Sequence, residues 1–377
     1  MTRLRTVLSP LPTIGQRHES KKKEGCGTTS KNCHPPECHS SPKNTCLFED
    51  GSQEGRRALS PQRLLLVSGK GGVGKTTVAA SLAVAAARTG RRVLLAGLDE
   101  ASVGQGTLLN APDPGPKEGP CESHSNLWNV NLDPLECLAA FGTLRMDRSN
   151  LIATLLKNTA SGQFLAAIPG LKSLALLGRL WYYTRETLSD GSPRFHTVIG
   201  ETTGLGHLGR LLRQPSSLLS TLPPSALRRD LEAIDSFISD PEKTGLVLVT
   251  LPEKIAVTET LELCQTLQKK GHPVALYVAN AVLEGAVWHD PLIEKLLASR
   301  GGSRSPAVRA LSRQSCLGAL LQETLFLKSR HESQKAGLEQ LQTSVGSRVA
   351  CLPQLPKAKL TLKEVEHLAS RLEPLFI

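Results

Sequence analysis

Short apolar runs alternate with longer amphipathic segments along most of the chain. Continuous apolar runs of about four to eight residues, bounded by turn residues, are typical of strands buried in a parallel sheet. We expect such strands at 62–67, 91–96, 127–132, 195–200, 246–251, 274–278 and 349–352. Apolar residues at helical spacing predict helices over 77–88, 255–270 and 361–372. This alternation predicts an α/β fold with a mainly parallel central sheet flanked by helices.

The segment from 133 to about 190 differs from the rest because its pattern is helical, with one break at Pro169-Gly170. Large apolar residues recur there at helical spacing, at Leu171, Leu174, Leu177, Leu180 and Trp181. They pack against the sheet or a second subunit, or they form a mobile helical subdomain with an apolar surface. The pattern leaves both alternatives open. We assign 133–190 and 212–240 to a helical insert of a domain spanning 61–377.

A glycine-rich loop follows the first predicted strand and precedes a helix of small residues. The loop consists of Gly69, Lys70, Gly71, Gly72, Val73, Gly74, Lys75, Thr76 and Thr77. Strand, glycine-rich loop and helix form the context of a phosphate-binding loop, whose backbone N–H groups and helix N-terminus hold phosphates. In this motif Lys75 reaches the outer phosphates and the Thr76 hydroxyl coordinates Mg²⁺. The sequence therefore predicts a P-loop NTPase.

Polar residues stand at the ends of three other predicted strands. Asp99 follows the strand at 91–96, at the sheet edge where a γ-phosphate and metal would lie. Glu201 follows the next strand and enters a glycine-containing loop, the expected place for a second metal-organising carboxylate and a nucleotide-sensing switch. The alternative for Glu201 is an exposed loop acid. Asn280 ends a later strand and can hydrogen-bond an adenine edge.

Composition narrows the class of protein further. The 377 residues are 40% hydrophobic and 3% aromatic, enough for one large domain or two modest ones. No apolar run reaches about 18 residues, so we expect no transmembrane helix. The net charge is +11, but no dense basic block lies beside aromatic residues, so we expect no nucleic-acid partner. The 9 irregularly spaced cysteines favour a reducing, cytoplasmic location.

Residues 1–60 are rich in Ser, Pro, Lys and Gly without periodicity, which predicts a disordered tail. The tail contains side chains that could bind zinc: Cys26, Cys33, His34, Cys38, His39 and Cys46. No CxxC pair occurs among them, so we favour a tail without metal. The first residues contain arginine and no acid, which leaves targeting to an organelle open.

Lys70 gives the loop the form KGGxGK[ST], which resembles the deviant loop of partition ATPases, nitrogenase iron protein and ArsA/Get-type ATPases. Four further stretches narrow the resemblance to the ArsA/Get-type family. These are HTVIGETTGLGHLGRLL at 196–212, EKTGLVLVTLPEKIAVTETLELCQTL at 242–267, YVANAVL at 277–283 and CLPQLP at 351–356. Their order and spacing agree from about 62 to 373, so the resemblance covers all but the tail.

The resemblance implies a homodimer that couples ATP hydrolysis to delivery of tail-anchored membrane proteins or to metalloid efflux. Lys70 would reach the nucleotide across the dimer interface. Asp99 would orient or deprotonate the attacking water, and Glu201 would hold Mg²⁺ through water. Asn280 and Pro353 would lie at the adenine. The partners would be a hydrophobic membrane-protein client, or a membrane receptor or pump.

The sequence departs from the family pattern at the switches. The first switch reads Asp99-Glu100-Ala101-Ser102 where the family has DPAH, and Glu201 replaces the usual Asp, so we expect slow catalysis. The CxxC pair that binds zinc between eukaryotic subunits is absent. With 2 methionines in the chain, a Met-rich client groove is missing as well. These features resemble the compact bacterial ArsA-like branch more than the eukaryotic targeting factor.

Several functions remain open at this point. We favour membrane-protein handling over metalloid efflux, because Cys121 and Cys137 are the only core cysteines close in sequence and arsenite needs clustered thiolates. A nucleotide-gated binding module without hydrolysis is the alternative that the altered switches motivate. A partition-type ATPase acting on DNA is disfavoured by the stretches at 196–212 and 242–267.

Overall fold

The computed structural model describes residues 59, 61–98, 104–115, 118–145, 170–220, 222–283, 315–346, 349–357 and 359–377. All of these residues belong to one unit, Asn44–Ile377. Most of the predicted tail lies outside the described residues. Leu59 is an exception, because it is fully buried and its N–H donates to the Leu375 carbonyl at 3.2 Å. The folded domain therefore begins before residue 61.

The described residues form a sheet of eight strands in the order β3-β4-β2-β5-β1-β6-β7-β8. The strands are β1 (Leu64–Gly69), β2 (Val93–Gly97), β3 (Cys121–His124), β4 (Leu127–Asn131), β5 (Thr197–Glu201), β6 (Thr244–Thr250), β7 (Val274–Val282) and β8 (Val349–Pro353). Neighbouring strands pair in parallel except β3, which pairs with β4 in the antiparallel sense. The predicted α/β fold with a mainly parallel sheet is confirmed.

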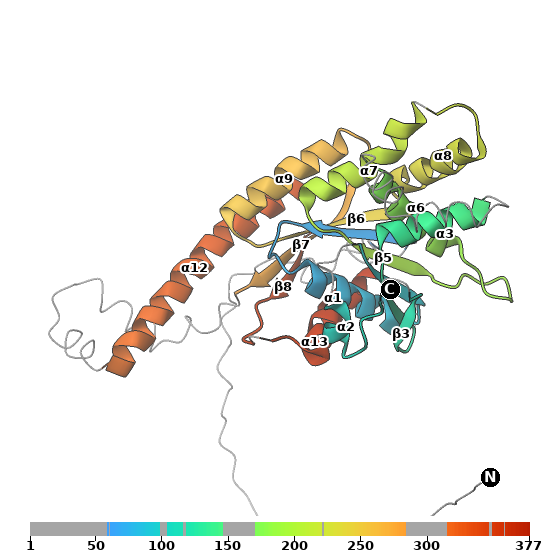
Figure 1. Cartoon of the computed structure of the whole chain (residues 1–377). Helices are drawn as coiled ribbons and strands as arrows, with labels where there is room; N and C mark the ends of the chain where they lie inside the picture. Colours follow the sequence, from blue (N-terminus) through green and yellow to red (C-terminus); the bar gives the residue numbers. More distant parts are fainter. Residues whose placement is uncertain are drawn as a thin grey trace, which may run out of the picture. The chain divides into compact units, whose positions relative to one another are not determined.

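Helices cover both faces of the sheet, as Figure 1 shows. One face carries α1 (Lys75–Arg88), α2 (Gln105–Leu109) and α13 (Leu362–Leu372). The other carries α3 (Pro134–Arg145), α6 (Leu171–Arg185), α7 (Leu205–Leu219), α8 (Ala226–Ser239), α9 (Lys254–Gln268) and α12 (Ser315–Val345). Alternate strand residues enter the two cores, so that Leu64 and Leu66 face α6 and α7 whereas Leu65 and Val67 face α1.

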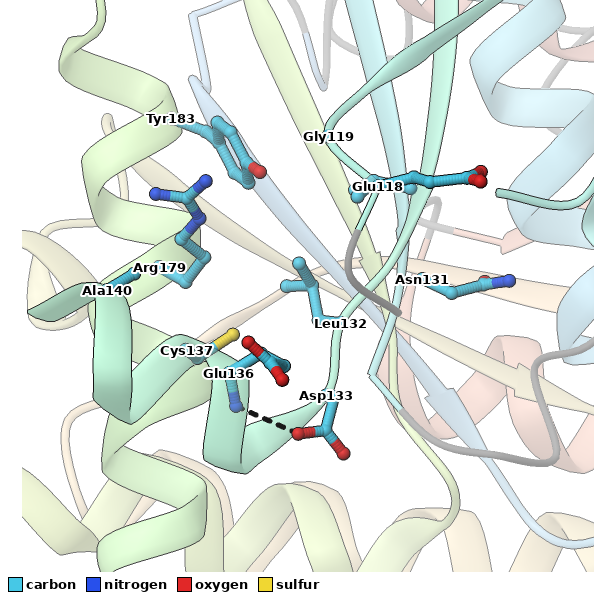
Figure 2. Close-up of a pocket in the computed structure, with 11 residues that line it drawn as sticks. Glu118, Gly119, Asn131, Leu132, Asp133, Glu136, Cys137, Ala140, Arg179 and Tyr183 are labelled. Atoms are coloured by element: carbon cyan, nitrogen blue, oxygen red, sulfur yellow. Dashed lines mark hydrogen bonds between the residues drawn. The ribbon is translucent and has the colours of Figure 1, made fainter. Parts of the chain in front are cut away.

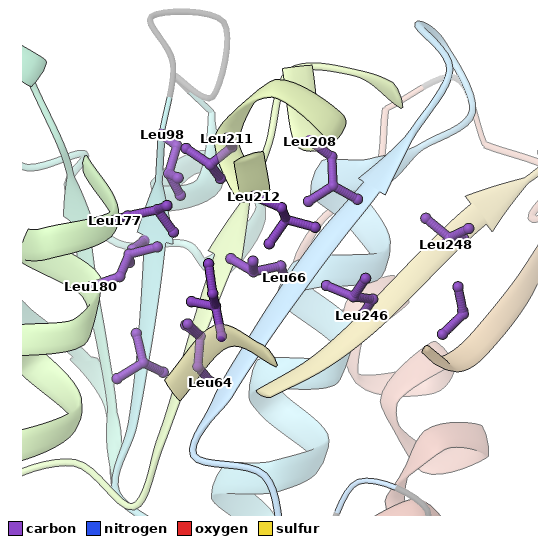
Figure 3. Packing of buried hydrophobic residues seen from close by; sticks show 14 of the residues in the cluster. Leu64, Leu66, Leu98, Leu177, Leu180, Leu208, Leu211, Leu212, Leu246 and Leu248 are labelled. Carbon is purple, nitrogen blue, oxygen red and sulfur yellow. The ribbon is translucent and has the colours of Figure 1, made fainter. Parts of the chain in front are cut away.

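Leucines from β1, β6, α6 and α7 interdigitate on the second face of the sheet (Figure 3). Leu177 and Leu180 of α6 are 1% and 0% exposed there, so packing against the sheet is the alternative that the structure shows for these leucines. Gly200 in β5 makes room for them. A Cβ at Gly200 would lie 3.1 Å from Leu180 Cδ1 and 3.2 Å from Leu66 Cδ2.

The structure differs from the predicted elements in two regions. Between the strands expected at 91–96 and 127–132, where no element is predicted, the structure has α2 and β3; α2 has only five residues, and β3 reads CESH without apolar alternation. The part of the helical insert assigned to 212–240 belongs to two helices, α7 and α8, and α7 begins at Leu205, soon after β5 ends. Among the described helices, none has the length and apolarity needed to cross a bilayer.

We predict that Leu180→Ala lowers the free energy of unfolding by about 2–5 kcal/mol, because it leaves a cavity between α6 and the sheet. The measurement is the urea-unfolding midpoint of the full chain. Leu227→Ala is the control, since Leu227 is 39% exposed on α8, and we expect a change within about 0.5 kcal/mol. Equal losses for both variants would contradict the assigned packing.

Candidate functional site

The glycine-rich loop connects β1 to α1 at the carboxyl edge of the sheet. Gly72 and Gly74 have φ values of +80° and +86°, a conformation that L side chains rarely adopt. Gly69 is required for a different reason, since a Cβ there would lie 2.3 Å from the Val249 carbonyl oxygen. Because Gly74 is the N-cap of α1 and has no side chain, the first N–H groups of α1 remain available to an anion.

The two lysines of the loop have different partners. Lys75 Nζ donates to the Lys70 carbonyl oxygen at 3.2 Å, so its ammonium group lies against the loop. Lys70 Nζ forms an ion pair with Glu259 Oε1 of α9 at 2.8 Å, and both side chains are well exposed. Such exposed pairs contribute about 0.2–1 kcal/mol, so a stronger anionic partner can displace Glu259. The role of Lys70 across a dimer interface stays a prediction.

Glu201 is the last residue of β5 and is 3% exposed, so it is not an exposed loop acid. Its Oε1 atom accepts a hydrogen bond from the Thr76 hydroxyl at 2.6 Å. Its Oε2 atom accepts one from Gln105 Nε2 at 2.8 Å. The structure therefore brings the two predicted metal-site residues, Thr76 and Glu201, into direct contact.

Parallel pairing places Glu201 beside two other strand ends. Glu201 is in register with Val67 of β1 and with Gly97 of β2. The N–H of Leu98 donates to the Glu201 carbonyl at 3.2 Å, and the N–H of Thr202 donates to the Val67 carbonyl at 2.9 Å. Asp99, the predicted catalytic acid, follows Leu98 directly and lies outside the described residues.

Gln105 was not anticipated from the sequence. It is the first residue of α2 and is fully buried. No local pattern identifies it, because its contact with Glu201 joins positions 96 residues apart. The signal that the sequence offered was its place three residues after the switch segment Asp99–Ser102.

The side chains around Glu201 fit Mg²⁺. The Glu201 carboxylate is buried between two neutral donors, and within the described residues it forms no ion pair. A buried carboxylate is costly without a positive partner. Carboxylate and hydroxyl oxygens beside a phosphate-binding loop are the hard ligands that Mg²⁺ prefers.

Asn280 supports the loop from β7. Its Nδ2 donates to the Val73 carbonyl oxygen at 2.9 Å, and a Cβ at Gly74 would lie 2.3 Å from the same nitrogen. Gln334 of α12 holds the following residues, donating to the Ala281 carbonyl and accepting from the Leu283 N–H. Asn280 thus lies inside β7, not at its end as expected, and braces the phosphate loop. Its contact with adenine stays a prediction.

Pro353 is the last residue of β8 and pairs with Val282 of β7. The structure therefore brings Pro353 and Asn280 to neighbouring strands at the same edge of the sheet. The predicted place of both residues at an adenine stays a prediction.

A separate pocket of about 260 Å³ opens at the carboxyl end of β4, where α3 and α6 meet (Figure 2). Cys137 and Tyr183 line it, and Arg179 lies over the Tyr183 ring with 4.5 Å to the centroid. Burial raises the pKa of the Cys137 thiol to about 12. Cys121 does not line this pocket. In the part of the chain that the structure describes, no three His, Cys, Asp or Glu side chains gather as a metal site.

The mainly parallel sheet and the glycine-rich loop between β1 and α1 define a P-loop nucleotide-binding protein. Comparison with known families agrees with this class. The model of the anion-transporting ATPase family matches residues 62–224 and 223–298. The chain therefore belongs to the anion-transporting ATPase family.

Individual relatives carry different names. ATPase BagA of Mycobacterium tuberculosis is 27% identical over 225 residues, covering 59% of this chain and 66% of the relative. The arsenical pump-driving ATPase of Acidiphilium multivorum is 30% identical over 256 residues, covering 60% of this chain and 41% of the relative. ATPase GET3 of Kluyveromyces lactis is 26% identical over 263 residues, covering 59% of this chain and 73% of the relative. The chain thus spans just under two thirds of the mycobacterial relative.

Proposed function

We propose that the protein is a Mg²⁺-dependent ATPase that converts ATP and water to ADP and phosphate. The observation that carries this proposal is the buried Glu201 carboxylate, hydrogen-bonded to Thr76 beside the phosphate loop. Membership of a family whose relatives are named ATPases supports the same activity.

The residues of the chain have separate roles in this proposal. The N–H groups of Gly72, Gly74 and the start of α1 bind the phosphates, and Lys75 exchanges the Lys70 carbonyl for a phosphate oxygen. Thr76 and Glu201 hold the metal, Glu201 through water. When bound, Mg²⁺ neutralises charge on the phosphate oxygens. Asp99 orients the attacking water and accepts its proton.

We infer a homodimer in which Lys70 serves the partner's nucleotide. The resemblance of the loop to deviant P-loops supports this assignment. In the single chain Lys70 is bound to Glu259, so dimerisation would exchange an exposed ion pair for a contact with phosphate. Adenine would lie between Asn280 of β7 and Pro353 at the end of β8.

For the cellular role we propose handling of hydrophobic membrane proteins in the cytoplasm. The resemblance to the ArsA/Get-type family supports it. A pump-driving role is the second candidate, because one relative is named an arsenical pump-driving ATPase and Cys137 lines a pocket. The second candidate is weaker, since the thiol of Cys137 is held neutral by burial and Cys121 lies outside that pocket.

Weak or absent hydrolysis is the remaining alternative, motivated by the altered first switch at Asp99–Ser102 and by Glu201 in place of Asp. A nucleotide-gated binding module would bind ATP tightly and release no phosphate. Steady phosphate release by the purified full chain would exclude it.

We predict that Lys75→Ala lowers kcat/KM for ATP by about 10²–10³-fold, because it removes a charge that stabilises the transferred phosphate. Asp99→Asn should lower kcat by about 10²–10⁴-fold and leave nucleotide binding intact, because it removes only the proton acceptor. Phosphate release and equilibrium binding of a fluorescent ADP measure the two effects.

Lys269→Ala is the matched control for charge, since Lys269 is exposed at the C-terminal end of α9. It should behave as the unmodified protein does. Full ATPase activity in Lys75→Ala or in Asp99→Asn would contradict the assigned roles.

Antimonite separates the two cellular roles. We predict that ATP turnover with and without antimonite agrees within about twofold, because a thiol with a pKa of about 12 stays protonated near neutral pH and clustered thiolates are what metalloids require. Clear stimulation that Cys137→Ser abolishes would reverse the preference and establish metalloid response.

A further inference from the structure

We propose that Gln105 is a positioning residue of the metal–nucleotide site, which fixes the Glu201 carboxylate. The proposal rests on the proposed function, because it concerns the same Mg²⁺ site. It adds a residue that neither the phosphate-loop motif nor the switch segments identify.

The first step is the contact itself. Gln105 is 0% exposed and Glu201 is 3% exposed, and their side chains are joined by a hydrogen bond of 2.8 Å. An ionised carboxylate only accepts hydrogen bonds, so the amide must present its NH₂ group to Glu201. The Gln105 carbonyl oxygen therefore points elsewhere. The two Glu201 oxygens have different donors, the Thr76 hydroxyl on one and the Gln105 amide on the other.

The second step is the carbonyl oxygen of the same amide. Gln105 Oε1 is buried and has no hydrogen-bond partner among the residues that the structure describes. Native proteins rarely leave such an atom unpaired, and water is the usual partner. An amide oxygen only accepts hydrogen bonds, so its partner is a donor such as water and not a phosphate oxygen. Mg²⁺ in proteins keeps several waters, and one of these is the donor that suits Gln105.

The third step is the rigidity of the element that carries Gln105. The N–H of Gly106 donates to Asp113 Oδ1 at 2.6 Å, and a Cβ at Gly106 would lie 2.6 Å from the Ala111 carbonyl oxygen. These contacts fix the start of α2. Gly104, with φ of +125°, takes up the turn immediately before it.

The fourth step is the hydrogen bonding of the described residues on either side of residues 99–103. Leu98, just before residues 99–103, donates its N–H to the Glu201 carbonyl at 3.2 Å. Gln105, just after them, donates to the Glu201 side chain. Both sides of the segment that contains Asp99 are therefore hydrogen-bonded to one residue. One of these bonds ends on the Glu201 backbone carbonyl and the other on its carboxylate.

The test compares Gln105→Leu with the unmodified full-length protein. The affinity for a fluorescent ADP is measured first in EDTA and then at increasing Mg²⁺ concentrations. The readout is the Mg²⁺ concentration at which half of the gain in ADP affinity is reached. In EDTA, we expect the ADP affinity of Gln105→Leu to be within about twofold of that of the unmodified protein. We expect the variant to need about tenfold more Mg²⁺ to reach half of the gain in affinity. Gln105→Asn keeps the amide on a shorter side chain, and it should also raise the Mg²⁺ requirement.

Gln62→Leu is the matched control. Gln62 is also buried at 6% exposure and donates its Nε2 to a partner, and its buried Oε1 also lacks a partner within the described part of the chain. It lies just before β1, at the opposite edge of the sheet from the phosphate loop. It should lower the thermal midpoint and leave the Mg²⁺ requirement unchanged, which separates positioning from a loss of stability.

The outcomes are distinguishable. If the unmodified protein binds nucleotide with a gain from Mg²⁺ and both Gln105 variants keep its Mg²⁺ requirement, the role of Gln105 is wrong and the proposed function stands. If Gln62→Leu raises the Mg²⁺ requirement as much as Gln105→Leu does, Gln105 is merely structural. If the unmodified protein shows no nucleotide binding, the proposed function fails and this inference fails with it. Should Gln105→Leu not fold, the same criteria apply to Gln105→Asn.

Discussion

The hydrogen bond between the Thr76 hydroxyl and the Glu201 carboxylate depends on the parallel pairing of β1 with β5. Because both strands end at the same edge of the sheet, the loop after β1 and the acid that ends β5 meet there. Register makes the contact specific, since Val67 is paired with Glu201 and a shift by one residue would turn the acid to the other face. The other hydrogen bonds of the site hold the phosphate loop and the end of β5 in place around this contact.

The phosphate loop is held from several sides before any ligand binds. Asn280 of β7 donates to the Val73 carbonyl, and α12 fixes the residues after Asn280 through Gln334. On the other side, Thr202 anchors the end of β5 to the Val67 carbonyl. A loop that is already shaped loses little conformational entropy when phosphate binds, which favours affinity. The two lysine side chains are each held by one exposed contact, which a bound anion can replace.

The sequence was informative where a local pattern carries the chemistry. Gly69 to Thr77, Glu201 and the buried strands are identified by motif, by strand-end position and by apolar runs. Gln105 was missed, since its partner is distant in the chain and α2 is too short to have a period. The bracing contact of Asn280 and the ion pair of Lys70 with Glu259 were missed for the same reason. Such contacts depend on which strands lie side by side in the sheet, and a local sequence pattern does not specify this order.

Calorimetric titration of the full-length protein with ADP, in Mg²⁺ and in EDTA, tests the central claim most directly. The claim is that Thr76 and Glu201 form a metal site beside a preformed phosphate loop. We predict about one nucleotide bound per chain, with tighter binding in Mg²⁺, and loss of that gain in Thr76→Ala. Binding of equal strength with and without Mg²⁺, or no binding of ADP by the unmodified protein, would contradict the account.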